Sequence, residues 1–196
     1  MPSRRYGNNT KLILAESLRN ELKLKPLDKI KICDIVSDCG LNRQTFYYHF
    51  QDIYALVEWM YKHDGIQIIK DNYSADSIIP TARAMLIYVD EHREELQCVT
   101  NSKAERYFFD FIINGMCKSI EILIENKTAD LKIDYAYRHF LAKYLTSAIL
   151  GVVEAWIRTT EEDRPSIDEL LRMFSDTVDG SMSLAIRNHI RNQNRY

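Results

Sequence analysis

Apolar residues recur along most of this chain three and four positions apart, the spacing that puts them on one face of an α-helix. Alternation of polar and apolar residues, typical of a half-buried strand, is nearly absent, and only six Gly and four Pro interrupt the pattern. The first expected helix covers residues 10–23, where Leu14, Leu18 and Leu22 lie four apart and Pro26 follows. The pattern therefore predicts an all-α protein.

The next part of the pattern predicts two short helices, over residues 31–39 and 43–50. Gly40 lies between them and suits a left-handed C-terminal cap, because glycine has no Cβ to clash in that conformation. Asn42 is expected to cap the second of these helices. A fourth helix is expected to open near Asp52 and to continue toward Asp71.

Longer helices are expected over residues 78–98, 103–126, 133–160 and 166–191. The start of the last one is marked by Pro165 and by the Ser-x-x-Glu spacing of Ser166 and Glu169, which is that of a capping box. We therefore expect a three-helix head at residues 1–52 and a larger helical body at residues 53–196.

Candidate chemistry concentrates in the stretch CGLNRQTFYYHFQDIY, which begins at Cys39. Two short helices joined by a Gly-containing turn form a helix-turn-helix, whose second helix enters the major groove of DNA with its N-terminal residues. Arg43 and Gln44 carry the side chains that pair with guanine and adenine, directly after the capping Asn42. Side chains suited to the phosphate backbone follow: Thr45, Tyr47, Tyr48 and His49.

The consecutive rings of this stretch allow a core interpretation as well. Phe46 and Phe50 lie four apart, so we expect both in the core. Tyr47 and Tyr48 occupy consecutive helix positions, which cannot share one buried face. We therefore expect these two rings to face DNA.

The charge distribution agrees with a DNA-binding head. The net charge is −2, but the first fifty residues carry nine Lys and Arg against five Asp and Glu. A basic head favours polyanionic partners, here double-stranded DNA. No apolar run approaches the roughly 20 residues of a membrane span, and no apolar segment follows the basic N-terminus. We therefore expect a cytoplasmic protein without a membrane partner.

Signals of catalysis or of metal binding are weak in this sequence. The histidines are widely separated, without a metal-binding HxxxH or HExxH pair, and no GxSxG or Gly-rich phosphate loop occurs. Four cysteines without CxxC spacing fit buried thiols in a reducing compartment, with a redox switch or a metal site as the alternative. The sequence thus predicts no enzyme, no cofactor and no metal.

The segment IKICDIVSDCGLNRQTFYYHFQDIYALVEWM resembles the DNA-binding head of the tetracycline-repressor (TetR) family, over about residues 10–61. The resemblance implies a homodimeric regulator on a palindromic operator, most often an effector-controlled repressor. The DNA contacts that it implies come from Lys31, Arg43, Gln44, Thr45, Tyr47, Tyr48 and His49, and we count Asn42 among the DNA-binding candidates as well. Lys31 stands where the family usually has Thr. Ile53 stands where the family usually has Lys, so one customary phosphate contact is missing.

The body offers two alternatives for the effector. Its aromatic residues fit plain core, but six residues are candidates for a small-molecule site: Arg106, Tyr107, Phe111, Asn114, His139 and Tyr144. The segment from Phe140 to Phe174 is similar to a TetR-like subgroup that includes activators of dihydroxyacetone-kinase operons, through Gly151, Trp156 and the Leu170–Leu171 region. That similarity implies an activator controlled by a partner protein. For the function of the whole chain, a further alternative is an architectural DNA-binding protein that recruits a partner.

Small residues in the last two expected helices indicate where the dimer forms. Ser147, Ala148 and Gly151 occur in the first of them, and Gly180 and Ser181 occur in the second, among apolar residues. Small side chains let helices approach closely. We therefore expect these two helices to pair between two copies of the chain.

Overall fold

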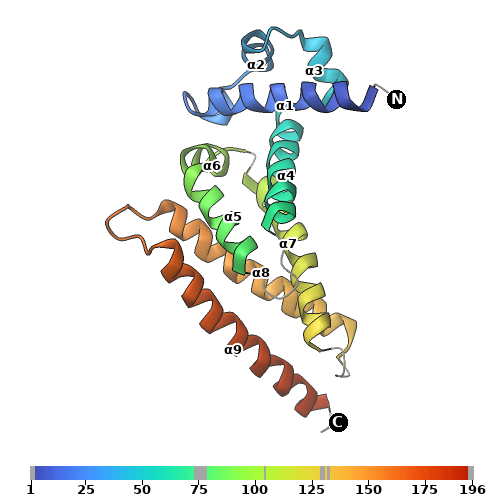
Figure 1. Cartoon of the computed structure of the whole chain (residues 1–196), viewed down its shortest axis with the longest axis vertical. Helices are drawn as coiled ribbons and strands as arrows, with labels where there is room; N and C mark the ends of the chain where they lie inside the picture. The colour runs from blue at the N-terminus through green and yellow to red at the C-terminus, as the bar shows by residue number, and fades with distance from the viewer. Residues whose placement is uncertain (1–2, 73–78, 104, 129–130, 132, 194–196) are drawn as a thin grey trace. The chain divides into compact units, whose positions relative to one another are not determined.

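The computed structural model describes residues 3–72, 79–103, 105–128, 131 and 133–193, and the described part is helical without a β-strand (Figure 1). This confirms the all-α prediction. Contacts divide the chain into two compact units, residues 1–109 and 110–196.

The N-terminal end of the first unit is a three-helix arrangement around the predicted leucine stripe. Helix α1 (Ser3–Leu22) packs against α2 (Ile32–Asp38) and α3 (Arg43–His49), and the short 3-10 helix η1 (Leu27–Lys29) connects α1 to α2. The fully buried side chains of this head come from all three helices: Leu14, Leu18, Leu22, Ile35 and Phe46. Helix α1 begins seven residues before the expected start, in a segment without an apolar stripe.

The turn between α2 and α3 is the predicted glycine turn. Gly40 has a φ of +66°, the left-handed conformation that favours glycine. The amide of Leu41 donates to the carbonyl of Val36 at 2.7 Å and that of Gly40 donates to Ser37 at 3.3 Å, the two bonds of a Schellman motif. These bonds end α2 and fix the direction in which α3 begins.

Helices α4 (Ile53–Asn72), α5 (Ile79–Glu91) and α6 (Arg93–Thr100) complete the first unit (Figure 1). The single helix expected over residues 78–98 is wrong, because the chain leaves the helix at His92, with φ −106° and ψ 20°. Neither Gly nor Pro marks this break, and apolar residues continue at helical spacing on both sides of it, so the pattern does not reveal it. The break starts α6 in a new direction and places Glu95 on its buried face.

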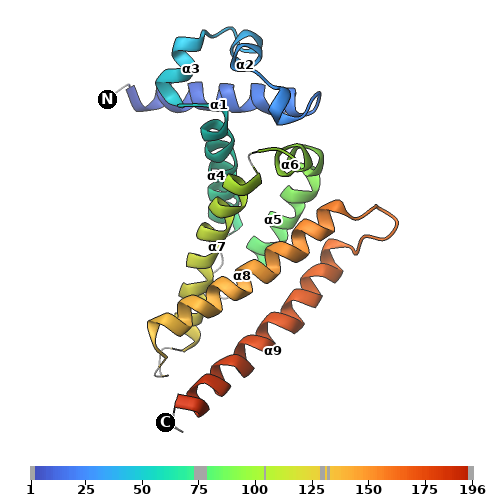
Figure 2. The ribbon, with the colours of Figure 1, turned by 180° about the vertical axis from the view of Figure 1, so that it is seen from behind.

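The second unit has its own core. Helix α7 (Glu105–Lys127) begins before the boundary, and α8 (Tyr135–Arg158) and α9 (Ile167–Gln193) lie side by side in both views (Figures 1 and 2). One buried cluster joins the three helices: Cys117, Ile120, Ile124, Leu141, Ala142, Leu145, Met182 and Ile186. The predicted Ser166–Glu169 capping box is confirmed, with the Ser166 amide donating to the Glu169 carboxylate at 2.9 Å.

Candidate nucleic-acid interface

The start of α3 presents polar side chains on a well-defined backbone. The Asn42 side chain accepts a hydrogen bond from the Thr45 amide at 2.8 Å and another from its hydroxyl at 3.1 Å, which confirms Asn42 as the N-cap. Arg43 and Gln44 follow this cap and are exposed. The first turn of α3 therefore exposes two side chains of the types that can pair with base edges.

The rings of α3 separate into an inner and an outer set. Phe46 is fully buried and Phe50 nearly so, with their ring centroids 5.9 Å apart, which confirms both as core residues. Tyr47 is 57% exposed and Tyr48 is 84% exposed. The expected outward direction of both tyrosines is thus observed, and their hydroxyls are accessible to a phosphate backbone.

His49 lies at the end of α3, between the outer and the inner rings. Its ring packs edge-on against Tyr48, with centroids 4.9 Å apart. Burial lowers the pKa of His49 below its ordinary value of 6.5, and the nearby charge of Lys11 lowers it further. A neutral imidazole is therefore favoured near pH 7, and a neutral imidazole has one N–H donor to offer.

Lys31 is the N-cap residue of α2 and is exposed. Its amide donates to Asp34 at 3.1 Å, while Lys25 donates to the same carboxylate at 2.7 Å. The bond from Lys25, and then the bond from the Lys31 amide, lower the pKa of Asp34. The start of α2 is thus held by hydrogen bonds to Asp34, and Lys31 is exposed there.

A buried ionic cluster, which the sequence did not predict, joins helix α1 of the head to α4, α5 and α6. Arg19 of α1 donates to Asp64 of α4, to Glu95 of α6 at 2.8 Å and to the hydroxyl of Tyr88 of α5 at 3.0 Å. Glu95 is only 4% exposed. Burial alone would lower the pKa of Arg19, but Tyr88, Asp64 and Glu95 outweigh it and raise that pKa. One charged side chain of α1 therefore connects three other helices of the same unit.

A sequence signal for this cluster does exist. Glu95 lies four residues before the fully buried Val99, so it occupies the apolar face of α6. An acid on such a face needs a cationic partner. Beside the cluster lies an open depression of about 410 Å³, lined by charged and polar groups that include Glu16, Lys23 and His92.

The candidate effector residues do not converge on one cavity in the part of the body that the structure describes. The side chains of Arg106, Tyr107 and Phe111 lie outside the described residues. Asn114 on α7 and Tyr144 on α8 are exposed, and Tyr144 stacks on Phe140. His139 pairs instead with Glu121 of α7. A ligand-binding role for these six residues stays a prediction.

Two further features of the chain are its four cysteines and the apolar helix α8. Cys117 is buried, while Cys33, Cys39 and Cys98 are partly buried, and all four are free thiols. Helix α8 is long and apolar enough to cross a membrane by length and composition. In the apolar stretch of 18 residues that meets this criterion, 28% of the stretch is buried. A single helix of this kind does not indicate a membrane protein, since core helices of other proteins have the same length and composition.

Comparison with known proteins decides the family. Residues 76–180, more than half of the chain, match the TetR family described as "Transcriptional regulator C-terminal region". The chain belongs to the TetR family of transcriptional regulators. The proteins of this family are DNA-binding regulators, and the chain is not an enzyme.

Individual relatives agree with the TetR assignment. The HTH-type dhaKLM operon transcriptional activator DhaS of Lactococcus lactis subsp. lactis (strain IL1403) is 25% identical over 145 residues, 73% of this chain and 76% of that protein. A solved structure of the dihydroxyacetone kinase operon activator DhaS superimposes with a TM-score of 0.68 at 20% identity, over 89% of this chain and 97% of that one.

A second solved structure shows the same fold. A TetR transcriptional regulator from Streptococcus agalactiae 2603V has a TM-score of 0.64 at 14% identity, over 94% of this chain and 97% of that one. The predicted similarity to the subgroup of dihydroxyacetone-kinase operon activators is thus confirmed by the matches to DhaS.

Proposed function

We propose that this TetR-family regulator binds a palindromic operator as a homodimer and activates transcription from it. The observation that carries the proposal is the first turn of α3, where Arg43 and Gln44 directly follow the Asn42 cap and are exposed. Side chains at the N-terminus of a recognition helix are the ones that reach base edges in the major groove. The DNA-binding part is the head, residues 1–52, and residues 53–196 form the regulatory body.

The remaining DNA contacts hold the head on the backbone. We assign Tyr47, Tyr48 and His49 to phosphates, because they follow the base-reading turn on the exposed side of α3. Thr45 is half-buried and already donates to Asn42, so it contributes less freely than the tyrosines. Lys31 adds a charge at the start of α2, the helix that crosses the backbone.

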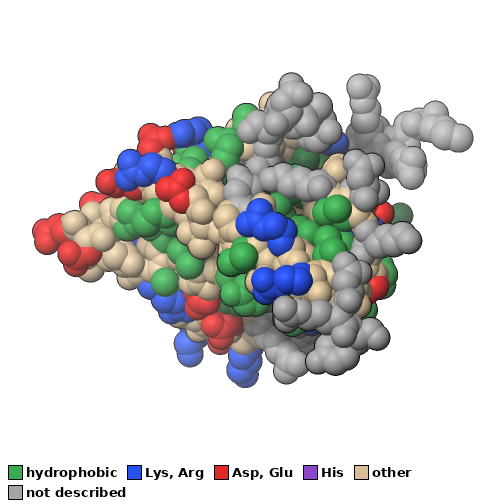
Figure 3. Space-filling view, turned by 90° about the horizontal axis from the view of Figure 1, so that it is seen from below, with side chains coloured by type: hydrophobic (Ala, Val, Ile, Leu, Met, Phe, Trp, Pro, Cys, Tyr) green, Lys and Arg blue, Asp and Glu red, His purple; other side chains and the backbone are tan. Residues whose placement is uncertain are grey.

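The dimer contact is supported by an unpartnered face on the last two helices. On α8 the exposed side of the helix carries Val152, which is 47% exposed, together with the small residues Ser147, Ala148 and Gly151. On α9 it carries Met173, 46% exposed, and Leu184, 53% exposed. Hydrophobic side chains also reach the surface on the face drawn in Figure 3. Apolar side chains that recur along one helix face indicate a second copy as the partner.

Two other apolar residues of α9 are less exposed than this face. Val178 packs against the chain's own core cluster, and Met182 belongs to that cluster. The face that a second copy would meet is therefore rotated toward Met173, Gly180 and Leu184. In a two-fold dimer the recognition helices then face successive major grooves, about 34–36 Å apart.

We infer the sign of regulation from the names of the relatives. The DhaS relative and the solved DhaS structure are both named as activators, which favours activation over the repression that is more common in the family. The effector is then a partner protein, with a small molecule as the alternative. Exposed aromatic side chains on α8, including Tyr135 and Phe140, suit a protein partner better than an enclosed small molecule. We place the regulator in the cytoplasm, where its DNA is.

Genome-wide footprinting of bound DNA tests the proposal. We expect one or a few promoter sites, each with an inverted repeat, and lower expression of the adjacent genes when the regulator is deleted. Higher expression after deletion would make the protein a repressor. Many dispersed sites without an inverted repeat would support the architectural alternative and contradict ours.

A further inference from the structure

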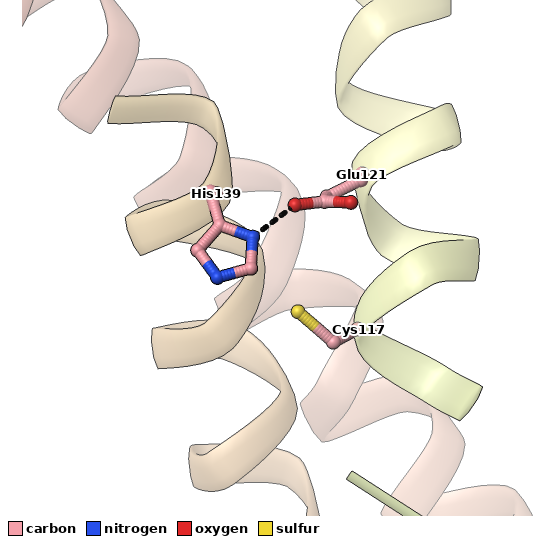
Figure 4. A group of neighbouring side chains, drawn as sticks. All are labelled: Cys117, Glu121 and His139. Atoms are coloured by element: carbon pink, nitrogen blue, oxygen red, sulfur yellow. Dashed lines mark hydrogen bonds and ion pairs between the residues drawn. The ribbon is translucent and has the colours of Figure 1, made fainter. Parts of the chain in front are cut away.

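Three side chains of the second unit bring a sulfur, an oxygen and a nitrogen together between α7 and α8. Cys117 and Glu121 come from α7 and His139 comes from α8 (Figure 4). One ligand atom of each, the thiol sulfur, a carboxylate oxygen and a ring nitrogen, lies within 4.8 Å of the other two. Among the described residues this is the group of His, Cys and acidic side chains with the spacing that a metal ion requires.

The helical register explains why the three groups meet. Cys117 and Glu121 are four residues apart, so their side chains lie on one face of α7, toward α8. His139 points at the same place from α8, and its Nδ1 contacts the Glu121 carboxylate. No sequence motif marks these donors, because Cys117 and His139 are 22 positions apart and lie on different helices.

Burial gives the cluster a closed side and an open side. Cys117 is 7% exposed and belongs to the core cluster, so it forms the closed side of the three-residue group. The Glu121 and His139 side chains are 26% and 50% exposed and form the rim. An ion can therefore enter from solvent without rearrangement of the core.

The imidazole is already oriented by a neighbour. The ring of Tyr135 stacks on the ring of His139, with centroids 5.9 Å apart and planes 20° apart. The adjacent Arg138 is paired with Glu125 at 3.0 Å, which leaves Glu121 to His139. Partners that fix a ligand's orientation favour metal binding, because less freedom is lost when the ion binds.

The donor set selects the class of ion. Thiolate, imidazole and carboxylate are together the ligands of Zn²⁺ and of similar divalent transition metals, whereas Mg²⁺ and Ca²⁺ take oxygen ligands. Metal–ligand bonds of about 2.0–2.3 Å require the three atoms to draw together by small side-chain rotations. Three protein ligands leave a fourth tetrahedral position for water or for an exchangeable group.

We propose that Cys117, Glu121 and His139 bind one divalent transition-metal ion of the zinc type, which ties α7 to α8 in the regulatory body. The alternative is an ordinary pair of His139 and Glu121 beside a buried thiol. The two differ in one measurable respect: only the metal site forms a bond to the Cys117 sulfur.

Cobalt absorption spectroscopy tests this, because Co²⁺ replaces Zn²⁺ and gives a thiolate-to-cobalt charge-transfer band when sulfur coordinates. Metal-free, reduced full-length protein would be titrated with CoCl₂ and then with ZnCl₂. We expect the band to saturate at roughly one Co²⁺ per chain and to disappear when Zn²⁺ displaces the cobalt. Absence of the band in the reduced wild type would overturn the proposal.

Variants assign the band to this cluster. Cys117→Ala should abolish it, and His139→Ala, an exposed position where the fold is retained, should weaken Co²⁺ binding at least about tenfold. Cys98→Ala, which removes a partly buried thiol on α6, and His189→Gln, which removes a histidine of the same unit, should leave the band unchanged. A band that survives in folded His139→Ala at wild-type affinity, or is lost in Cys98→Ala, would contradict the site.

Discussion

The guanidinium of Arg19 on α1 and the carboxylate of Glu95 on α6 form an ion pair of 2.8 Å inside the first unit, with side chains 12% and 5% exposed. The pair joins a helix of the DNA-binding head to a helix that begins at the His92 break. A buried pair of this kind contributes little net stability by itself, but the loss of one partner leaves an uncompensated buried charge.

Arg19→Met should therefore lower the free energy of unfolding by about 3–5 kcal/mol. Urea denaturation of the purified protein measures this. The double variant Arg19→Met, Glu95→Leu should recover much of the loss, because the more deeply buried acid is then gone, and the remaining Asp64 is 23% exposed and still accepts from the Tyr88 hydroxyl. Arg172→Met, at an exposed position of α9, is the control and should stay within about 0.5 kcal/mol of wild type. An Arg19→Met loss as small as that of the control would mean that Arg19 is dispensable to the fold.

The lowered pKa of His49 predicts how operator binding depends on pH. Burial and Lys11 hold the pKa of His49 below 6.5. His49 is therefore neutral between about pH 7 and 8, and its titration should not change operator affinity in that range. As the pH falls below 6.5, the imidazole gains a positive charge beside a phosphate, so operator affinity should rise. Fluorescence anisotropy from pH 8 to 5.5 would measure it. His49→Gln should remove this rise, and identical profiles for the two proteins would exclude His49 as the source.

The dimer face on α8 and α9 predicts an effect on assembly. Each aliphatic side chain that an interface buries contributes about 1.5–3 kcal/mol, or tenfold and more in the dimer Kd. The double variant Val152→Glu, Leu184→Glu should thus be a monomer by light scattering at micromolar concentration, where the wild type is a dimer. Ile122→Glu, on an exposed position of α7 at 52%, is the matched control and should remain a dimer. A wild-type monomer would contradict the homodimer, and a double variant that stays dimeric would place the interface elsewhere.

Much of the head could be predicted because its signals are local. The Gly40 turn, the Asn42 cap and the Phe46–Phe50 pair depend on residues within a few positions of one another. Local backbone preferences and helix spacing therefore determine them. The direction of Tyr47 and Tyr48 followed from the same spacing.

The features that escaped prediction depend on distant parts of the chain. The break at His92 has no Gly or Pro, and the residues of the neighbouring Arg19 cluster come from four helices. The Cys117–Glu121–His139 cluster requires the packing of α7 on α8, which the apolar pattern leaves undefined. Tertiary contacts of this kind are not contained in a short window of sequence.

Base readout by the start of α3 is the central claim, and a binding titration series tests it most directly. Wild type, Arg43→Ala, Tyr47→Phe and Lys31→Ala would be titrated on the operator and on a scrambled duplex, at three salt concentrations. Arg43→Ala should cost about 1–3 kcal/mol per half-site on the operator and little on the scrambled duplex. Tyr47→Phe should weaken both duplexes alike, and Lys31→Ala should reduce the salt slope by about one unit per subunit. Equal losses for Arg43→Ala on both duplexes would make Arg43 a backbone contact and contradict the assignment of base readout to α3.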